Sequence, residues 1–136
     1  MSGVVRIRRV VLEEMVKEAR RAGGVECCGL LAGRGGVITT IYPAPNALAS
    51  AAAYEIAPAE LFRIFREMRA VGLEHMGIYH SHPAGENTPS ARDVEQAYYP
   101  EAAYFIVSPA DNVERAIRAF SIRAGQVAEL TIELVN

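Results

Sequence analysis

The sequence predicts a single domain over residues 1–136 of the α/β or α+β class, with helices flanking one central mixed β-sheet. Two amphipathic helical segments alternate with short apolar strands early in the chain, and a run of strands ends it. The length of 136 residues fits one compact domain and is too short for two.

The amino-terminal elements are a strand, a helix and a β-hairpin. Residues 3–8 alternate weakly between apolar and polar side chains, which predicts an edge strand. Residues 10–22 predict a helix that ends at Gly23, with one apolar face made of Val11, Met15, Ala19 and Ala22. Residues 25–33 are apolar and bounded by glycines, so we expect a buried strand paired in a hairpin with residues 37–45.

The middle of the chain contains a loop, a longer helix and a further strand. The alanine-rich stretch 46–54 has no clear periodicity, which indicates a loop. Residues 58–72 begin with a proline suited to a first helical turn and carry an apolar stripe of Leu61, Ile64, Phe65 and Met68. We also expect Phe62 in the core with Phe65 and Met68. Residues 75–82 predict a strand.

The carboxy-terminal part combines a short helix with three strands. Thr88-Pro89 predicts the N-cap and first position of a helix that runs to about Tyr98. Residues 102–108 are apolar and predict another buried strand. Residues 115–123 and 126–134 predict a terminal hairpin that turns at Ala124-Gly125.

The composition excludes several classes of function. A net charge of −2 provides no basic surface for a nucleic acid or an anionic membrane. No apolar run approaches the roughly 20 residues that span a bilayer, and the amino terminus has no signal-peptide pattern. Cys27 and Cys28 are adjacent and cannot close a loop, which favours a reducing, cytoplasmic location. The oligomeric state stays open.

The stretch GIYHSHPAGENTPSARD, residues 77–93, holds the residues best suited to chemistry. His80 and His82 are two apart on a strand, so their imidazoles share a face and can converge on one metal ion. Asp93 lies near the start of the following helix, where the loop can return its carboxylate. Two histidines and one carboxylate leave one tetrahedral position open, which is typical of catalytic zinc.

Simpler interpretations apply to some of these residues. A single histidine near a strand end is usually solvated or hydrogen-bonded, and we expect this for His75. Ser90 and Asp93 also match the S-x-x-D pattern of a helix cap, which is a purely local device.

The pattern His80-x-His82-Pro, followed by Ser90 and Asp93, resembles the JAMM motif of the MPN-domain metalloproteases. Upstream, ECCGLLAG at residues 26–33 is similar to a segment of that family, and the order of elements is similar along nearly the whole chain. The resemblance implies the MPN fold, an architecture similar to that of cytidine deaminases. It also implies one zinc ion per chain, held by His80, His82 and Asp93, with Glu26 as general base and Ser90 helping to hold the oxyanion.

Members of this family hydrolyse amide or isopeptide bonds after the C-terminal Gly-Gly of ubiquitin-like proteins. This chain lacks the long insertions of the eukaryotic deubiquitinating members and resembles compact prokaryotic members, some of which act on β-grasp sulfur-carrier proteins. The resemblance therefore implies a zinc peptidase or isopeptidase whose partner is a ubiquitin-like or sulfur-carrier protein. Two alternatives stay open, namely a non-catalytic MPN scaffold and a zinc hydrolase of small peptides or metabolites.

Other candidate residues favour packing over chemistry. Cys27 and Cys28 would face opposite ways on a strand, which argues against a thiol nucleophile. We expect both to be small buried hydrophobes, with metal ligation or redox sensing as lesser alternatives. A zinc nucleotide deaminase would need a Pro-Cys-x-x-Cys segment, which the sequence lacks. We expect the Tyr98-Tyr99 pair to pack at a helix end.

Overall fold

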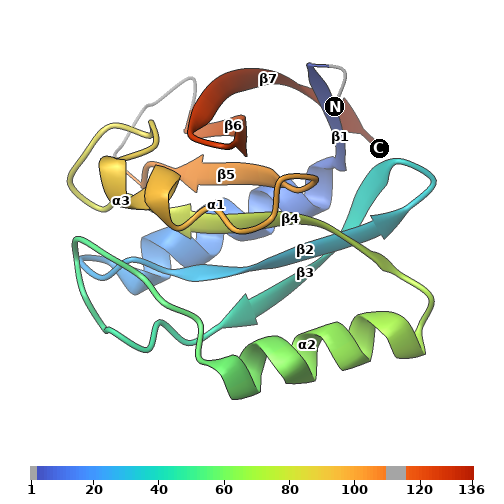
Figure 1. Cartoon of the computed structure of the whole chain (residues 1–136), viewed down its shortest axis with the longest axis horizontal. Coiled ribbons are helices and arrows are strands. Elements are labelled where there is room, and N and C mark those ends of the chain that lie inside the picture. Colours follow the sequence, from blue (N-terminus) through green and yellow to red (C-terminus); the bar gives the residue numbers. More distant parts are fainter. Residues whose placement is uncertain (1–2, 110–115) are drawn as a thin grey trace.

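Seven strands and three helices form the described part of the computed structural model, which covers residues 3–109 and 116–136 (Figure 1). The strands are β1 (Val4–Arg8), β2 (Cys28–Arg34), β3 (Val37–Ala44), β4 (Glu74–Ser81), β5 (Ala103–Val107), β6 (Ile117–Arg123) and β7 (Gln126–Val135). The helices are α1 (Arg9–Ala22), α2 (Pro58–Ala70) and α3 (Ala91–Glu95). None of the helices in the described residues is long and apolar enough to cross a membrane.

All seven strands belong to one mixed sheet in the order β1-β3-β2-β4-β5-β6-β7, which closes because β1 also pairs with β7. The central mixed sheet and the α+β class are therefore confirmed. β1 has a partner on both sides, so the prediction of an edge strand at residues 3–8 is wrong. Only Val5 and Ile7 of this strand are buried, and such alternation reports burial of one face without revealing how many neighbours a strand has.

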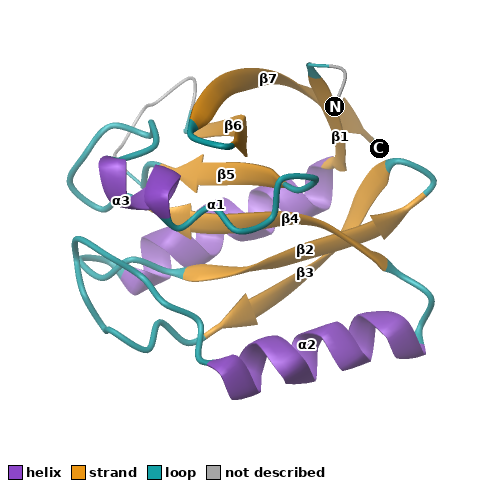
Figure 2. Ribbon diagram, in the orientation of Figure 1, coloured by secondary structure: helices purple, strands orange, loops and turns teal. Residues whose placement is uncertain are grey.

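The helices α1 and α2 lie on opposite faces of this sheet (Figure 2). On the α1 side, Met15 packs in one buried cluster with Leu31 and Phe105. On the α2 side, Ile64 and Met68 belong to a second buried cluster. The two clusters use alternate residues of the same strands, as the pleat of a sheet buried on both faces requires. Both faces of the central strands are thus covered, which leaves the strand ends as places for a site.

The helix α2 corrects one core assignment. The side chains of Ile64 and Met68 are buried as predicted, but Phe62 is 65% exposed and is not part of the core. Phe62 follows Leu61 by one residue, so it points about 100° around the helix from the apolar stripe. The guanidinium of Arg66 lies over its ring, 5.6 Å from the centroid.

Several predicted boundaries shift by a few residues. β2 begins at Cys28, three residues later than expected, and β4 ends at Ser81, so Glu26 and His82 lie just outside regular strands. The helix α3 is capped by Ser90, not Thr88, and it ends at Glu95, before Tyr98. The terminal hairpin turns at Ala124-Gly125 with positive φ at both residues, as predicted. Residue 115, the predicted first residue of this hairpin, lies outside the described residues.

Two glycines of β2 permit close approaches that a methyl group would block. A Cβ on Gly29 would lie 2.5 Å from the carbonyl oxygen of Tyr42 and from the hydroxyl of Tyr79. A Cβ on Gly33 would lie 1.8 Å from the carbonyl oxygen of Val37, where the register of β2 and β3 shifts. The glycines of the Glu26–Gly33 segment therefore have a packing reason, independent of chemistry.

Replacing Gly33 with alanine should lower the free energy of unfolding by about 1–3 kcal/mol or more, because backbone and not a flexible side chain must move. Gly24→Ala is the matched control, since nothing lies within 4 Å of a Cβ there, and it should change stability by less than about 0.5 kcal/mol. Urea unfolding of both variants measures the difference. A Gly33→Ala protein as stable as the control would contradict the close approach.

Candidate metal centre

The carboxyl end of β4 brings His80, His82 and Asp93 together. The Nε2 atoms of the two histidines are 3.0 Å apart, and they lie 3.2 Å (His80) and 3.1 Å (His82) from Oδ2 of Asp93. A tetrahedral zinc with bonds of about 2.0–2.2 Å separates its ligand atoms by about 3.3–3.6 Å. The three atoms therefore form a triangle that could hold a metal ion after a small outward shift.

The sheet explains why the two imidazoles converge. His80 is buried within β4, opposite Cys28 of β2 and Ile106 of β5. His82 follows the end of β4, but its backbone N–H still donates to the carbonyl oxygen of Val107 at 2.9 Å. The chain thus stays extended for one more residue, and the prediction that His80 and His82 share a face is confirmed.

The donor set has the chemistry of a cation site. Nδ1 of His82 lies 2.7 Å from the carbonyl oxygen of Glu86, which can only accept, so Nδ1 carries a proton. Neutral His82 therefore presents a lone pair on Nε2 to the carboxylate of Asp93. Two lone pairs at 3.1 Å repel unless a proton or a metal ion lies between them.

The pKa shifts of His80 and Asp93 agree with this interpretation, whereas the raised pKa of His82 means that a metal ion must displace a proton from its Nε2. Burial lowers the pKa of His80 despite the neighbouring Asp93, which keeps its imidazole neutral. Burial opposes ionisation of Asp93, but hydrogen bonds with His80 and His82 outweigh it and hold the pKa of that carboxyl well below its usual range. Burial also disfavours protonation of His82, yet Asp93 and the Glu86 carbonyl raise its pKa overall. A neutral imidazole beside an ionised carboxylate is the state that binds a metal cation.

Asp93 serves the helix and the site at once. Its Oδ2 accepts a hydrogen bond from the backbone N–H of Ser90 at 2.9 Å, and the hydroxyl of Ser90 accepts one from the backbone N–H of Asp93 at 3.1 Å. This is a complete capping box, so the local interpretation of the S-x-x-D pattern is also confirmed. The cap fixes the rotamer that directs Asp93 toward the histidines.

Glu26 lies in the segment before β2 and is 4% exposed. Its Oε1 is buried without a hydrogen-bond partner in the described residues. Burial raises the pKa of Glu26 to about 7, with His82 and Arg92 opposing the shift and Asp93 adding to it. Glu26, His82 and Ser90 line one hollow of about 210 Å³. The structure therefore gathers Glu26, Ser90 and the three candidate ligands in one place.

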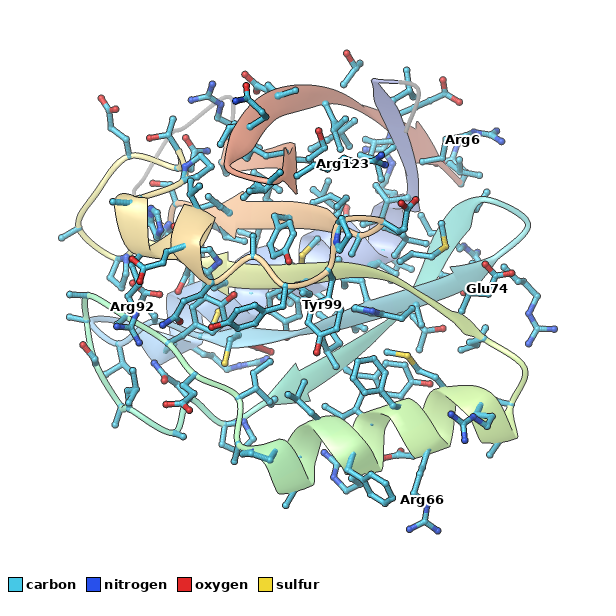
Figure 3. All side chains as sticks on the ribbon, viewed as in Figure 1. Arg6, Arg66, Glu74, Arg92, Tyr99 and Arg123 are labelled. Carbon is cyan, nitrogen blue, oxygen red and sulfur yellow. The ribbon has the colours of Figure 1, made fainter. Side chains whose placement is uncertain are left out.

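Sequence reasoning missed one aromatic residue of the site. The ring of Tyr54 stacks on the ring of His80, with centroids 4.5 Å apart and an angle of 22° between the planes. Tyr54 ends the alanine-rich stretch 46–54, which is a loop as predicted. It also lines a second hollow, of about 310 Å³, together with Arg92 and Tyr99, which are labelled in Figure 3. The sequence did contain a signal for Tyr54, because it is the one aromatic residue in the alanine-rich stretch 46–54.

The remaining candidates are mostly packing residues. Cys27 and Cys28 are buried in different clusters, and burial raises the pKa of each thiol to about 12, so neither is a nucleophile at neutral pH. Nε2 of His75 lies 3.0 Å from the carbonyl oxygen of Gly77, which confirms a hydrogen-bonded histidine. Tyr99 packs against His75, but Tyr98 is 71% exposed, so that half of the tyrosine prediction is wrong.

A mixed sheet between two helices, with this group at the end of a central strand, defines a JAB/MPN-type domain. The family model for prokaryotic homologs of the JAB domain matches residues 8–123, so the chain belongs to that family. The resemblance to the MPN-domain metalloproteases is thereby confirmed.

Individual proteins support this assignment. The chain is 35% identical over 135 residues to the CysO-cysteine peptidase of Mycobacterium tuberculosis, covering 98% of this chain and 92% of that protein. It is 34% identical over 130 residues to a Thermus thermophilus protein named "Probable TtuB-protein conjugate cleaving protease", covering 95% and 83%. The solution structure of protein DSY2949 from Desulfitobacterium hafniense superposes with a TM-score of 0.85 at 33% identity, covering 98% of this chain and 94% of that one.

Glu26→Gln should stabilise the metal-free protein at alkaline pH. The pKa of Glu26 rises from 4.5 to about 7 on folding, so the folded state loses stability as the pH rises through about 7 and carries no such penalty below about 4.5. Glutamine cannot ionise. We expect a gain of about 1–3 kcal/mol in the free energy of unfolding at about pH 8, and none at about pH 4.

Urea unfolding of both proteins with a chelator, at the two pH values, measures this gain. Equal stability of the two proteins at about pH 8 would show that the Glu26 carboxylate is better solvated than its burial indicates.

Proposed function

We propose that this protein is a zinc peptidase that hydrolyses the amide bond after the C-terminal Gly-Gly of a ubiquitin-like or sulfur-carrier protein. The observation that carries the proposal is the triangle of His80 Nε2, His82 Nε2 and Asp93 Oδ2, with sides of 3.0–3.2 Å, beside a buried glutamate. Two free, buried thiols, those of Cys27 and Cys28, support a reducing, cytoplasmic location.

His80, His82 and Asp93 would hold one zinc ion per chain. Two imidazoles and one carboxylate are a ligand set of catalytic zinc sites, which keep a fourth position open. When bound, zinc supplies a Lewis acid that brings the pKa of a coordinated water to about 7. The carbonyl of Glu86 holds His82 in the tautomer that this role requires.

Glu26 is the proposed general base. Its carboxylate accepts a proton from the attacking water and later delivers it to the leaving amine. Burial raises the pKa of Glu26 to about 7 in the metal-free protein, and a zinc ion held beside it would lower that pKa and so favour the carboxylate that accepts the proton. Glu26 shares a hollow with His82, so a water molecule can reach both the carboxylate and the proposed ligands.

Ser90 is the proposed oxyanion donor. Its Oγ accepts a hydrogen bond from Asp93 N–H at 3.1 Å, and its own hydroxyl proton is not used in that bond. Ser90 is exposed in the same hollow as Glu26, so this proton can be donated to a developing negative charge.

The relatives support the choice of substrate. One is named for cleavage of CysO-cysteine and another for cleavage of TtuB-protein conjugates. Both names describe cleavage of a named partner, CysO or TtuB, from the group joined to it. A scaffold without catalysis needs none of the proposed ligands, whereas all three are present and converge here.

Metal binding tests the ligand set. The purified protein should bind one zinc ion, and His80→Ala, His82→Ala or Asp93→Ala should each weaken zinc affinity by at least about tenfold, because a three-ligand site has no spare donor. His75→Gln is the control and should keep the metal. Elemental analysis and titration calorimetry give stoichiometry and affinity. Stoichiometric zinc in a His80→Ala/His82→Ala double variant would reject the site.

Hydrolysis tests the reaction. Zinc-loaded protein incubated with a β-grasp carrier extended past Gly-Gly should release the extension, followed by intact mass. Glu26→Gln should lower kcat by about 10²–10⁴-fold with little change in KM and retained zinc. Cys28→Ser, which removes a thiol with no proposed catalytic role, should stay within about tenfold of wild type.

The alternatives give distinct outcomes in the same assay. Cleavage of short peptides but not of carriers would indicate a hydrolase of small substrates. Zinc binding without any hydrolysis would indicate a scaffold.

A further inference from the structure

The backbone of Glu26 lies outside the regular sheet. The pairing of β2 with β4 starts at Cys28 opposite His80, two residues after the proposed base. A general base must nevertheless sit within hydrogen-bond reach of its proton, about 2.6–3.2 Å, and an error of about 1 Å can cost about 10²-fold in rate. The position of Glu26 therefore depends on contacts other than strand pairing.

Ser81 supplies one set of these contacts. It lies between the two proposed histidine ligands and is fully buried. Its backbone N–H donates to the carbonyl oxygen of Cys27 at 3.1 Å, and its Oγ accepts from the backbone N–H of Cys27 at 2.9 Å. Ser81, which separates His80 from His82, thus binds both the N–H and the carbonyl of Cys27, the residue next to Glu26.

Asn46 holds Glu26 from the other side. Its Nδ2 donates to the carbonyl oxygens of Glu26 and Ala53, each at 3.0 Å. Its Oδ1 accepts from the backbone N–H groups of Leu48 and Glu55, at 3.0 Å and 3.2 Å. The amide therefore uses both N–H groups of Nδ2 as donors and both lone pairs of Oδ1 as acceptors to join the loop before α2 to Glu26.

We propose that Ser81 is a positioning residue that fixes Glu26 relative to the two histidines, and that Asn46 completes the restraint from the loop. This inference rests on the proposed function, in which Glu26 is the base. Ser81 does not act on the substrate, because its hydroxyl is buried against Cys27. It transmits the rigidity of β4 to the segment that carries the base.

Ser81→Ala removes the bond from Cys27 N–H and the interaction of the hydroxyl with the Cys27 thiol, and it keeps the backbone bond from Ser81 N–H to the Cys27 carbonyl. We expect kcat to fall by about 10–100-fold while KM for the extended carrier and zinc content stay unchanged. Ser81→Thr keeps the hydroxyl and should recover most of kcat. Asn46→Asp keeps the oxygen that accepts from Leu48 and Glu55 but loses the donors to Glu26 and Ala53, and it should also lower kcat.

The decisive measurement is a double-mutant cycle with Glu26→Gln. If Ser81 acts through Glu26, Ser81→Ala should lower the residual rate of Glu26→Gln by less than about twofold. A loss in the Glu26→Gln background equal to that in wild type would overturn the inference, as would a fully active Ser81→Ala protein.

Hydrogen exchange gives a readout that needs no activity. The amide proton of Cys27 should exchange at least about tenfold faster in Ser81→Ala than in wild type. Unchanged protection would reject the restraint itself. If the wild-type protein hydrolyses no carrier, the proposed function is rejected, and the catalytic role of Ser81 with it, even when Cys27 exchanges faster in Ser81→Ala.

Discussion

A single carboxylate oxygen, Oδ2 of Asp93, connects the short helix, the end of β4 and the candidate metal centre. It accepts a hydrogen bond from Ser90 N–H and lies within 3.2 Å of both Nε2 atoms of the histidine pair. Because α3 has only five residues, it has little stability of its own and depends on this cap. Helix formation and assembly of the centre are therefore one event, and each favours the other.

The two sides of the site differ in how they are held. His80 belongs to a strand with partners on both edges and a helix over each face, so its backbone has little freedom. Glu26 and Tyr54 come from segments outside the sheet, and the hydrogen bonds of Ser81 and Asn46 fix them near that strand. Glu26 in addition keeps a buried oxygen without a partner among the described residues, which destabilises the fold at the place where a reactive carboxylate is useful.

Local pattern was sufficient to predict the convergence of the two histidines in the candidate centre. Because side chains alternate along a strand, His80 and His82 are predicted to share a face. The positions of glycines and prolines predict the ends of most helices and strands to within a few residues. The sequence could not show that β1 has two neighbours, because its partners β3 and β7 are remote in the chain. Only the fold brings Glu26 near His82, so its role came from the resemblance to a known family.

The same limit applies to residues whose function is to hold others. Asn46 and Ser81 are ordinary polar residues in the sequence, and their partners are backbone groups that carry no sequence signal. Phe62 shows the opposite error, since an aromatic residue one step away from an apolar stripe was assigned to the core by its type alone. An apolar residue type favours burial, but the position of the residue around the helix determines whether its side chain is buried.

The parallel pairing of β1 with β7 has a consequence for how the chain is made. Val4–Arg8 must wait for Thr131–Val135 before the sheet can close, whereas the strands around the candidate centre, β2 to β5, end at Val107. During synthesis, the centre can therefore form while β1 still has one open edge, and an open strand edge can pair with another chain. A nascent chain stalled before β7 would carry the residues of the candidate centre in place and yet be prone to aggregate.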